Sequence, residues 1–264
     1  MEVHHPTTIA DAVAAMAEGA LALAGGTDVM VEVNFGHARP QNVVSLRRIA
    51  ALSTWEGNRI GAGVTWSRLE NDGPTALAQA ARTVGSPQIR NAGTLGGNVG
   101  TASPAGDGLP FLAAVDASIE LESDIGPRSM PWDQFFVGVK KTARLAGELI
   151  TSVRLPDVLP ERQHFGKVGV RNAMVIATVC SVVTRDHSGR TTVALGSVAP
   201  TPIRAHRAEE MISSIARPTE SDLSEFARIV SEEVSPITDH RSTEGYRRHA
   251  AGVLARRLLQ RCLR

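Results

Sequence analysis

The hydrophobic and polar positions of the chain predict short helices and strands in mixed order. Between Thr8 and Gly19, apolar residues recur at helical spacing, which predicts a capped helix. Apolar stretches at 20–24 and 43–46 predict buried strands, and the first leads through a Gly-Gly turn into a short helix over 29–33. The other elements predicted before residue 156 are strands at 59–64, 118–121 and 148–155 and helices at 75–84 and 111–115.

Glycine and proline are dense between residues 85 and 110. That density predicts a long ordered loop without a regular element. A loop of this length in a compact domain is usually functional or disordered. Apolar side chains spread through the segment favour order: Ile89, Leu95, Val99, Leu109 and Phe111.

The pattern changes after the proline-rich stretch at 156–160, which predicts a boundary between a domain over 1–158 and another over 160–264. The second domain is expected to hold three strands followed by three helices, an α+β arrangement. The strands are predicted at 165–170, 175–184 and 191–198, and the helices at 205–215, 221–234 and 243–263.

Composition excludes several classes of function. Lys+Arg is 28 and Asp+Glu is 27, a balance that argues against a dedicated nucleic-acid binder. Two cysteines, Cys180 and Cys262, cannot by themselves hold an iron–sulfur cluster or a structural zinc. The histidines show no metal-ligand spacing, and no hydrolase nucleophile motif is present, so we expect no metal and no acid–base catalyst.

The compartment is expected to be the cytoplasm. The first residues lack the pattern of a signal peptide, and no apolar run approaches the ~18 residues of a membrane span. Two distant cysteines do not suggest a disulfide framework, which favours a reducing environment.

The first candidate motif is the segment from Leu23 to Asp28, in which a strand leads into Gly25-Gly26-Thr27. Backbone N–H groups at such a helix start, together with the helix dipole, bind anions such as phosphate. A tight turn that needs a positive φ is the alternative interpretation.

The second candidate motif runs from Arg90 to Val99 and contains Gly96-Gly97, followed by Asp107. Two Gly-rich turns could clamp the two groups of a diphosphate through main-chain amides, and Asp107 could accept a hydrogen bond from a ribose or ribityl hydroxyl. The alternative is a structural loop with a capping aspartate. Neither motif matches the dinucleotide fingerprint or the P-loop.

These segments resemble the FAD-binding (medium) subunits of the molybdenum hydroxylases, the xanthine dehydrogenase and aerobic carbon monoxide dehydrogenase flavoproteins. The segment ALAGGTDVMVEV is similar to the first FAD segment of the family, and QIRNAGTLGGNVGTASPAGDGLPFLAAVDASIEL to the second. Further matches, such as ELITSVRLP and LGSVAPTPIRAHRAEE, follow in the family's order and extend the resemblance over nearly the whole chain.

The resemblance implies an α+β fold of the vanillyl-alcohol-oxidase (PCMH) type, with FAD between two lobes at about 1–55 and 56–158 and a smaller α/β C-terminal domain. It implies a cofactor site built from 18 residues. One group lies in the first segment: Leu23, Ala24, Gly25, Gly26, Thr27, Asp28, Val29 and Met30. The others are Val84, Thr94, Leu95, Gly96, Gly97, Asn98, Thr101, Asp107, Ile150 and Lys167.

Lys167 has two interpretations. A cation beside the flavin would stabilise its reduced, anionic form, whereas a lysine at a strand edge is usually solvated. Only Lys140 and Lys141 accompany it as lysines in the chain.

The resemblance also implies partners: a small subunit with 2Fe-2S clusters and a large molybdopterin subunit, in a heterotrimer that is doubled. The chain would pass electrons from those clusters through FAD to an external acceptor. A stand-alone flavin oxidase and a flavin-free assembly module remain as alternatives. The arginines of the last helix, from Arg247 to Arg264, suggest a solvated face or a docking surface for a partner subunit.

Overall fold

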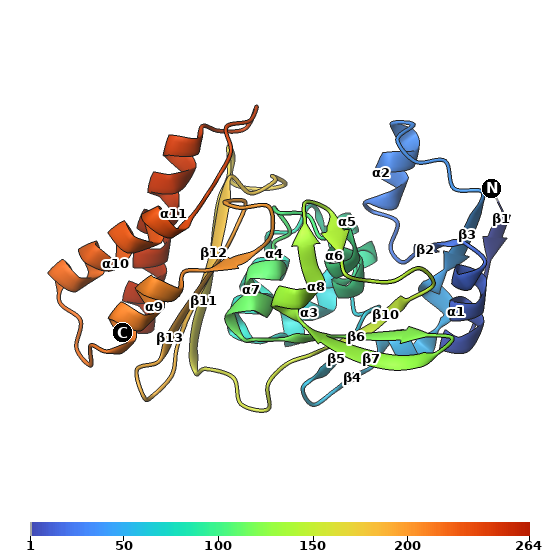
Figure 1. Ribbon diagram of the computed structural model, residues 1–264, viewed down its shortest axis with the longest axis horizontal. Coiled ribbons are helices and arrows are strands. Elements are labelled where there is room, and N and C mark those ends of the chain that lie inside the picture. The colour runs from blue at the N-terminus through green and yellow to red at the C-terminus, as the bar shows by residue number, and fades with distance from the viewer. Residues whose placement is uncertain (1) are drawn as a thin grey trace.

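The computed structural model describes residues 2–264, and its three main sheets follow one another along the long axis of the molecule (Figure 1). The first sheet is parallel and has the spatial order β1 (Glu2–His4), β3 (Asn42–Ser45), β2 (Leu21–Leu23). Helix α1 (Ile9–Ala17) begins where the Thr8 side chain accepts a hydrogen bond from the Asp11 N–H. Helix α2 (Val29–Asn34) follows β2 and stands away from the sheet (Figure 1).

The second sheet is antiparallel and has five strands. Their order is β4 (Trp55–Glu56), β5 (Arg59–Gly61), β10 (Leu149–Arg154), β6 (Ser118–Ser123), β7 (Gly126–Pro131). Short helices join its strands: α3 (Trp66–Asp72), α4 (Thr75–Arg82), α5 (Pro87–Ala92), α6 (Leu95–Thr101), α7 (Leu109–Ala114) and α8 (Trp132–Phe135). A small hairpin, β8 (Phe136–Gly138) with β9 (Lys141–Thr142), precedes β10.

The prediction of a loop without regular elements over 85–110 is wrong. Helices α5 and α6 lie inside this range, and α7 begins at its end. The side chains of Ser86 and Thr94 cap α5 and α6 by accepting hydrogen bonds from Ile89 N–H and Gly97 N–H. Six- and seven-residue helices with good caps tolerate glycines that a longer, isolated helix would not, because packing supplies their stability.

The third sheet has four strands, where the sequence predicts three. Its order is β11 (Arg162–Val168), β12 (Val179–Arg185), β13 (Thr191–Gly196), β14 (Ile203–Arg204). Strand β14 has two residues and follows Pro202, so it carries no recognisable strand pattern. The three predicted helices are present as α9 (His206–Ser213), α10 (Glu220–Glu233) and α11 (Glu244–Cys262).

Both faces of the third sheet are covered, so every residue of β12 and β13 is buried. Helices α9 and α11 pack on one face, with α10 packed against both of them, and α4 and α7 of the preceding part of the chain pack on the other face (Figure 1). Side chains alternate between the two sides: Val183 belongs to the apolar cluster under the helices, and Val182 to the cluster of the N-terminal part. Burial on both faces explains the continuous apolar run in this strand.

Hydrogen bonds that each involve at least one main-chain group reinforce this junction. Phe165 N–H donates to Gln79 Oε1 at 2.8 Å, and Ser197 N–H donates to the Pro104 carbonyl at 2.7 Å. Thr192 Oγ1 donates to the Ala114 carbonyl at 2.8 Å. These contacts hold β11 and β13 against the helices of the second sheet. The α+β architecture and the helical C-terminal layer therefore agree with the predicted fold class.

The arginines of α11 do not form one solvated face. Arg247 is buried and donates to the carbonyls of Thr178 and Ser197, while its other terminal nitrogen pairs with Asp239 at 2.7 Å. Arg256 pairs with Glu220 of α10. Part of the arginine cluster therefore fixes the C-terminal helices to the sheet. Among residues 2–264, no helix has the length and hydropathy needed to span a membrane.

A pH-dependent contribution to stability is expected from Glu120 on β6. Burial alone would raise its pKa, but hydrogen bonds from Ser152, Arg59 and Arg154 outweigh burial and lower the pKa to about 2. The carboxylate therefore stabilises the fold above its unfolded pKa of about 4.3, and this contribution is lost as the pH falls toward 2. We expect Glu120→Gln to be less stable than the native chain at pH 7 and nearly equal to it near pH 2.

Urea unfolding at several pH values measures this difference. Glu122→Gln, two residues along the same strand, is the control and should show little change at any pH. A stability difference for Glu120→Gln that does not shrink on acidification would contradict the assignment.

Candidate functional site

The first Gly-Gly segment forms the turn between β2 and α2. Gly26 has a φ of +72°, and Asp28 precedes the first residue of α2. Within residues 2–264, the backbone N–H groups of the segment from Gly25 to Asp28 donate to no protein acceptor. Four successive unpaired amides at the start of a helix form an anion-binding environment.

The second segment lies directly beside the first. A Cβ placed on Gly25 would overlap the carbonyl oxygen of Ala92 and lie 2.9 Å from the Gly93 nitrogen. Thr101 Oγ1, at the end of α6, donates to Asp28 Oδ2 at 2.6 Å. The two Gly-rich segments, about 70 positions apart in sequence, thus meet through backbone contact at one end and a side-chain hydrogen bond at the other.

The sequence predicted that the second segment would also bind through free backbone N–H groups, but these N–H groups are used inside the protein. Leu95 N–H and Gly96 N–H donate to the carbonyls of Val64 and Ala62, and Gly97 N–H donates to Thr94 Oγ1. Gly96 is required for packing, because a Cβ there would lie 2.5 Å from Ala62 Cβ. The expectation of two equivalent amide grips is therefore wrong: the first segment carries the free amides, and α6 supports it.

Asp107 and Lys167 form a buried ion pair beside these segments. Lys167 Nζ lies 2.6 Å from Asp107 Oδ2, and the two side chains are 7% and 9% exposed. Lys167 Nζ also donates to the Thr83 carbonyl at 3.4 Å. Burial raises the pKa of Asp107 to about 6, and Lys167 acts in the opposite direction. The interpretation of Lys167 as a solvated strand-edge lysine is therefore wrong.

Two buried oxygens near this pair lack a hydrogen-bond donor in the part of the chain that the structure describes. They are Asp107 Oδ1 and Asn98 Oδ1. A Cβ on Gly108 would lie 2.9 Å from Asn98 Oδ1, which places the Asn98 side chain against the loop that carries Asp107. An unpaired buried acceptor costs about 1–3 kcal/mol, so these oxygens suit a ligand that supplies hydroxyl or N–H donors.

The remaining predicted site residues lie around these segments and differ in how deeply they are buried. Val84 follows Thr83 and is half-buried, and Ile150 on β10 is buried with its Cδ1 close to Gly100. Leu95 and Thr94 lie in the core, so the Leu95 side chain supports α6. The half-buried members of the first segment are Leu23, Ala24, Gly25, Gly26, Thr27 and Val29, and Met30 is 38% exposed.

Sequence reasoning missed three residues that complete the arrangement. The Thr83 carbonyl accepts from Lys167, Gly93 lies against Thr27, and Trp66 packs against Gly108. Their roles depend on contacts between distant segments. No local motif marks Thr83 or Trp66, and Gly93 lies inside the second candidate motif without being assigned to the site. The one available signal was the position of Thr83 and Gly93 next to predicted site residues.

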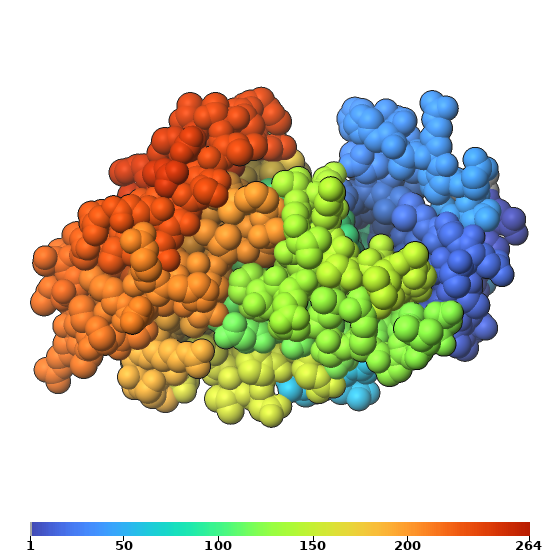
Figure 2. Space-filling model, in the orientation of Figure 1, coloured from blue at the N-terminus to red at the C-terminus, as the bar shows by residue number. Residues whose placement is uncertain are grey.

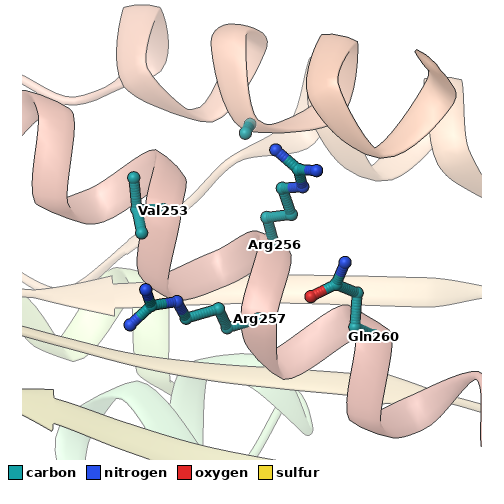
Figure 3. Close-up of a pocket in the computed structure, with 5 residues that line it drawn as sticks. Val253, Arg256, Arg257 and Gln260 are labelled. Carbon is teal, nitrogen blue, oxygen red and sulfur yellow. The ribbon is translucent and has the colours of Figure 1, made fainter. Parts of the chain in front are cut away.

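Two open cavities lie elsewhere, in the C-terminal domain. One, of about 300 Å³, is a groove between α10 and α11 with Val253, Arg256, Arg257 and Gln260 on its α11 side (Figure 3). The other, of about 410 Å³, includes Arg162, Arg185 and His187. Arg162 and Arg185 donate there to carbonyls at the ends of α11 and α9, so their charges complement helix C-termini. Neither cavity contains a residue of the candidate site.

Comparisons with known proteins agree with this geometry. Residues 1–158 match the family described as "FAD binding domain in molybdopterin dehydrogenase", and residues 165–262 match "CO dehydrogenase flavoprotein C-terminal domain". The nicotinate dehydrogenase FAD-subunit of Eubacterium barkeri is 35% identical over 209 residues, which covers 72% of this chain and 70% of the relative.

Longer matches give the same result. The xanthine dehydrogenase FAD-binding subunit of Escherichia coli O157:H7 is 29% identical over 276 residues, 97% of this chain and 94% of the relative. A solved chain of the reconstituted CO dehydrogenase from Oligotropha carboxidovorans superposes with a TM-score of 0.91 at 29% identity, covering 100% of this chain and 97% of that one.

Proposed function

Because the chain belongs to the FAD-binding subunits of the molybdenum-containing hydroxylases and dehydrogenases, we propose that it holds one FAD between its two Gly-rich segments. A bound flavin would supply one- and two-electron redox chemistry. The chain's own contribution is to bind and orient the cofactor and to set the charge around it. The proposed site comprises the 18 predicted residues, in which the buried residues of α6 act as support, within domains over 1–158 and 160–264 and lobes at about 1–55 and 56–158.

The observation that carries the proposal is the convergence of free donors and free acceptors. The amides from Gly25 to Asp28 would bind the diphosphate. Asp107 Oδ1 and Asn98 Oδ1 would accept hydrogen bonds from hydroxyl groups of the flavin side chain. The Lys167 ammonium, held by Asp107, supplies a positive charge that favours added negative charge on the flavin.

The electrons would come from another polypeptide. Cys180 and Cys262 are both buried, separate thiols, so this chain offers no set of ligands for an iron–sulfur cluster. Relatives are named as medium chains of carbon monoxide dehydrogenase and as a FAD-subunit of nicotinate dehydrogenase. We propose that this chain joins an iron–sulfur small subunit and a molybdopterin large subunit in a doubled heterotrimer in the cytoplasm.

Purification of the chain tests the cofactor assignment. We expect a yellow protein with absorbance near ~450 nm and one FAD released per chain on denaturation. A colourless chain that does not respond to added FAD would favour the flavin-free assembly module. Turnover of a substrate by this chain alone would favour a stand-alone oxidase, whereas turnover only with both partner subunits supports the electron-transfer role.

A further inference from the structure

The lysine-bearing turn between β8 and β9 contacts the helix that follows the first Gly-rich segment. Lys140 Nζ lies 2.7 Å from Glu32 Oε1 of α2, and the two side chains are 52% and 34% exposed. Glu32 also faces His37, whose Nδ1 lies 3.2 Å from the other carboxylate oxygen. Residues from the two predicted lobes, 108 positions apart, are thus joined at the outer side of the candidate site.

The main chain of Lys140 is anchored as well. Its N–H donates to the Ala102 carbonyl at 3.1 Å, immediately after the last residue of α6. Lys140 and Ala102 have φ values of +51° and +47°, which non-glycine residues rarely adopt and which persist where surrounding contacts impose them. The neighbouring Thr101 donates to Asp28, so the turn, α6 and the first segment meet at one place.

Glu32 is rigidly connected to the free amides. The Asp28 carbonyl accepts hydrogen bonds from the N–H groups of Val31 and Glu32, and the Gly26 carbonyl accepts from Met30. A force that holds Glu32 therefore also holds the turn from Gly25 to Asp28. Apart from this tether, α2 projects from the body of the molecule, and its segment is separated by a notch from the adjacent surface in Figure 2.

We propose that Lys140 and Glu32 are positioning residues that form a clasp over the diphosphate-binding turn and slow the release of FAD. The proposal rests on the proposed function, because it assigns the turn to the diphosphate. In the clasped state, α2 stays against the end of α6, and the amides from Gly25 to Asp28 stay in one arrangement. Release of FAD requires α2 to move outward, and this movement breaks the Lys140–Glu32 pair.

The exchange of bound FAD for an excess of isotopically labelled FAD tests the clasp, with the full chain desalted rapidly and analysed by mass spectrometry. We expect Lys140→Met and Glu32→Gln each to exchange FAD about two- to fivefold faster than the native chain, the range typical of a partly exposed ion pair. The double variant should exchange no faster than either single variant. Lys140→Arg should retain slow exchange.

Lys141→Met is the matched control, because Lys141 is the adjacent lysine and forms no ion pair within residues 2–264. It should exchange FAD at the native rate. Added salt should accelerate exchange in the native chain and have less effect on Lys140→Met, a response that a purely structural role of the turn would not produce.

The two proposals fail differently. Native exchange rates in Lys140→Met and Glu32→Gln, with FAD still bound, would overturn the clasp and leave the cofactor assignment intact. Absence of FAD binding in the native chain would overturn both. Because both side chains are partly exposed, the variants are expected to fold, and circular dichroism of each variant checks this.

Discussion

Replacement of Gly25 by alanine is expected to destabilise the fold and weaken FAD binding at least tenfold. The added Cβ would overlap the Ala92 carbonyl oxygen, which is main chain at the end of α5 and cannot rotate away. Overpacking of this kind costs about 1–3 kcal/mol, and a clash with backbone lies at the upper end. The turn and the end of α5 must separate, so the free amides and the Asp107 region no longer face one ligand.

Thermal unfolding of the FAD-free chain and titration with FAD, followed by flavin fluorescence, measure the two effects separately. Gly245→Ala is the control, because a Cβ there meets no atom within 4 Å and the residue lies in the first turn of α11. It should bind FAD normally and gain up to about 1 kcal/mol from helix propensity. Native stability and FAD affinity in Gly25→Ala would show that the two segments are not packed as described.

Replacement of Asp107 by asparagine is expected to have the largest effect of any single substitution. It leaves the Lys167 ammonium buried without its carboxylate, and breaking a buried pair in this way costs about 3–5 kcal/mol. Lys167→Met should cost less, because the carboxyl can take up a proton. Its pKa is already raised to about 6 by burial, and the loss of the ammonium raises the pKa further.

The pH dependence of Lys167→Met follows from that shift. A carboxyl whose folded pKa lies above its unfolded value binds a proton earlier in the folded state as the pH falls. The variant should therefore gain stability relative to pH 7 as the pH is lowered toward the unfolded pKa of about 3.9. Urea unfolding at pH 7, 6 and 5 measures this gain, and a loss of stability over that range would contradict the assignment.

The double variant Asp107→Asn/Lys167→Met separates stability from binding. Removal of both charges should restore much of the stability lost in Asp107→Asn, since a neutral pair has no uncompensated charge. FAD affinity should remain below that of the native chain, because the neutral amide oxygen that replaces the unpaired carboxylate oxygen Oδ1 is a weaker hydrogen-bond acceptor. Recovery of both properties together would mean that Asp107 acts only through folding. Glu225→Gln, which removes a partner of the exposed Arg228, is the control and should change little.

Sequence patterns correctly predicted helices and strands that are stabilised by their own residues. The helix after Thr8 depends on its cap and apolar spacing, and the structure places α1 there. Strand β10 and the three C-terminal helices also lie close to their predicted ranges. The strand β14 was missed because it has only two residues, and α5 and α6 were missed because the glycines and prolines in and around them favour loops, so contacts with neighbouring segments stabilise them.

The candidate site, like the fold, was predicted from the sequence only in part. The glycine pairs and Asp107 stand out in the sequence, because few other roles need glycine twice in succession beside polar residues. The sequence did not show that the two glycine pairs have different roles. The amides of Gly96 and Gly97 donate inside the protein, whereas those of the first segment are free. Whether an amide is free depends on the acceptors near it, here the carbonyls of Ala62 and Val64, which belong to another part of the chain.

The sequence by itself determined the family, the fold class and the two segments proposed to face the cofactor, since these depend on motifs in a fixed order along the chain. The tertiary structure decided which amides are free, that Lys167 is buried against Asp107, and that Lys140 reaches Glu32. The last two of these facts are contacts between residues 60 and 108 positions apart. The physical reason is that burial and charge pairing depend on distance in space, which a one-dimensional pattern does not contain.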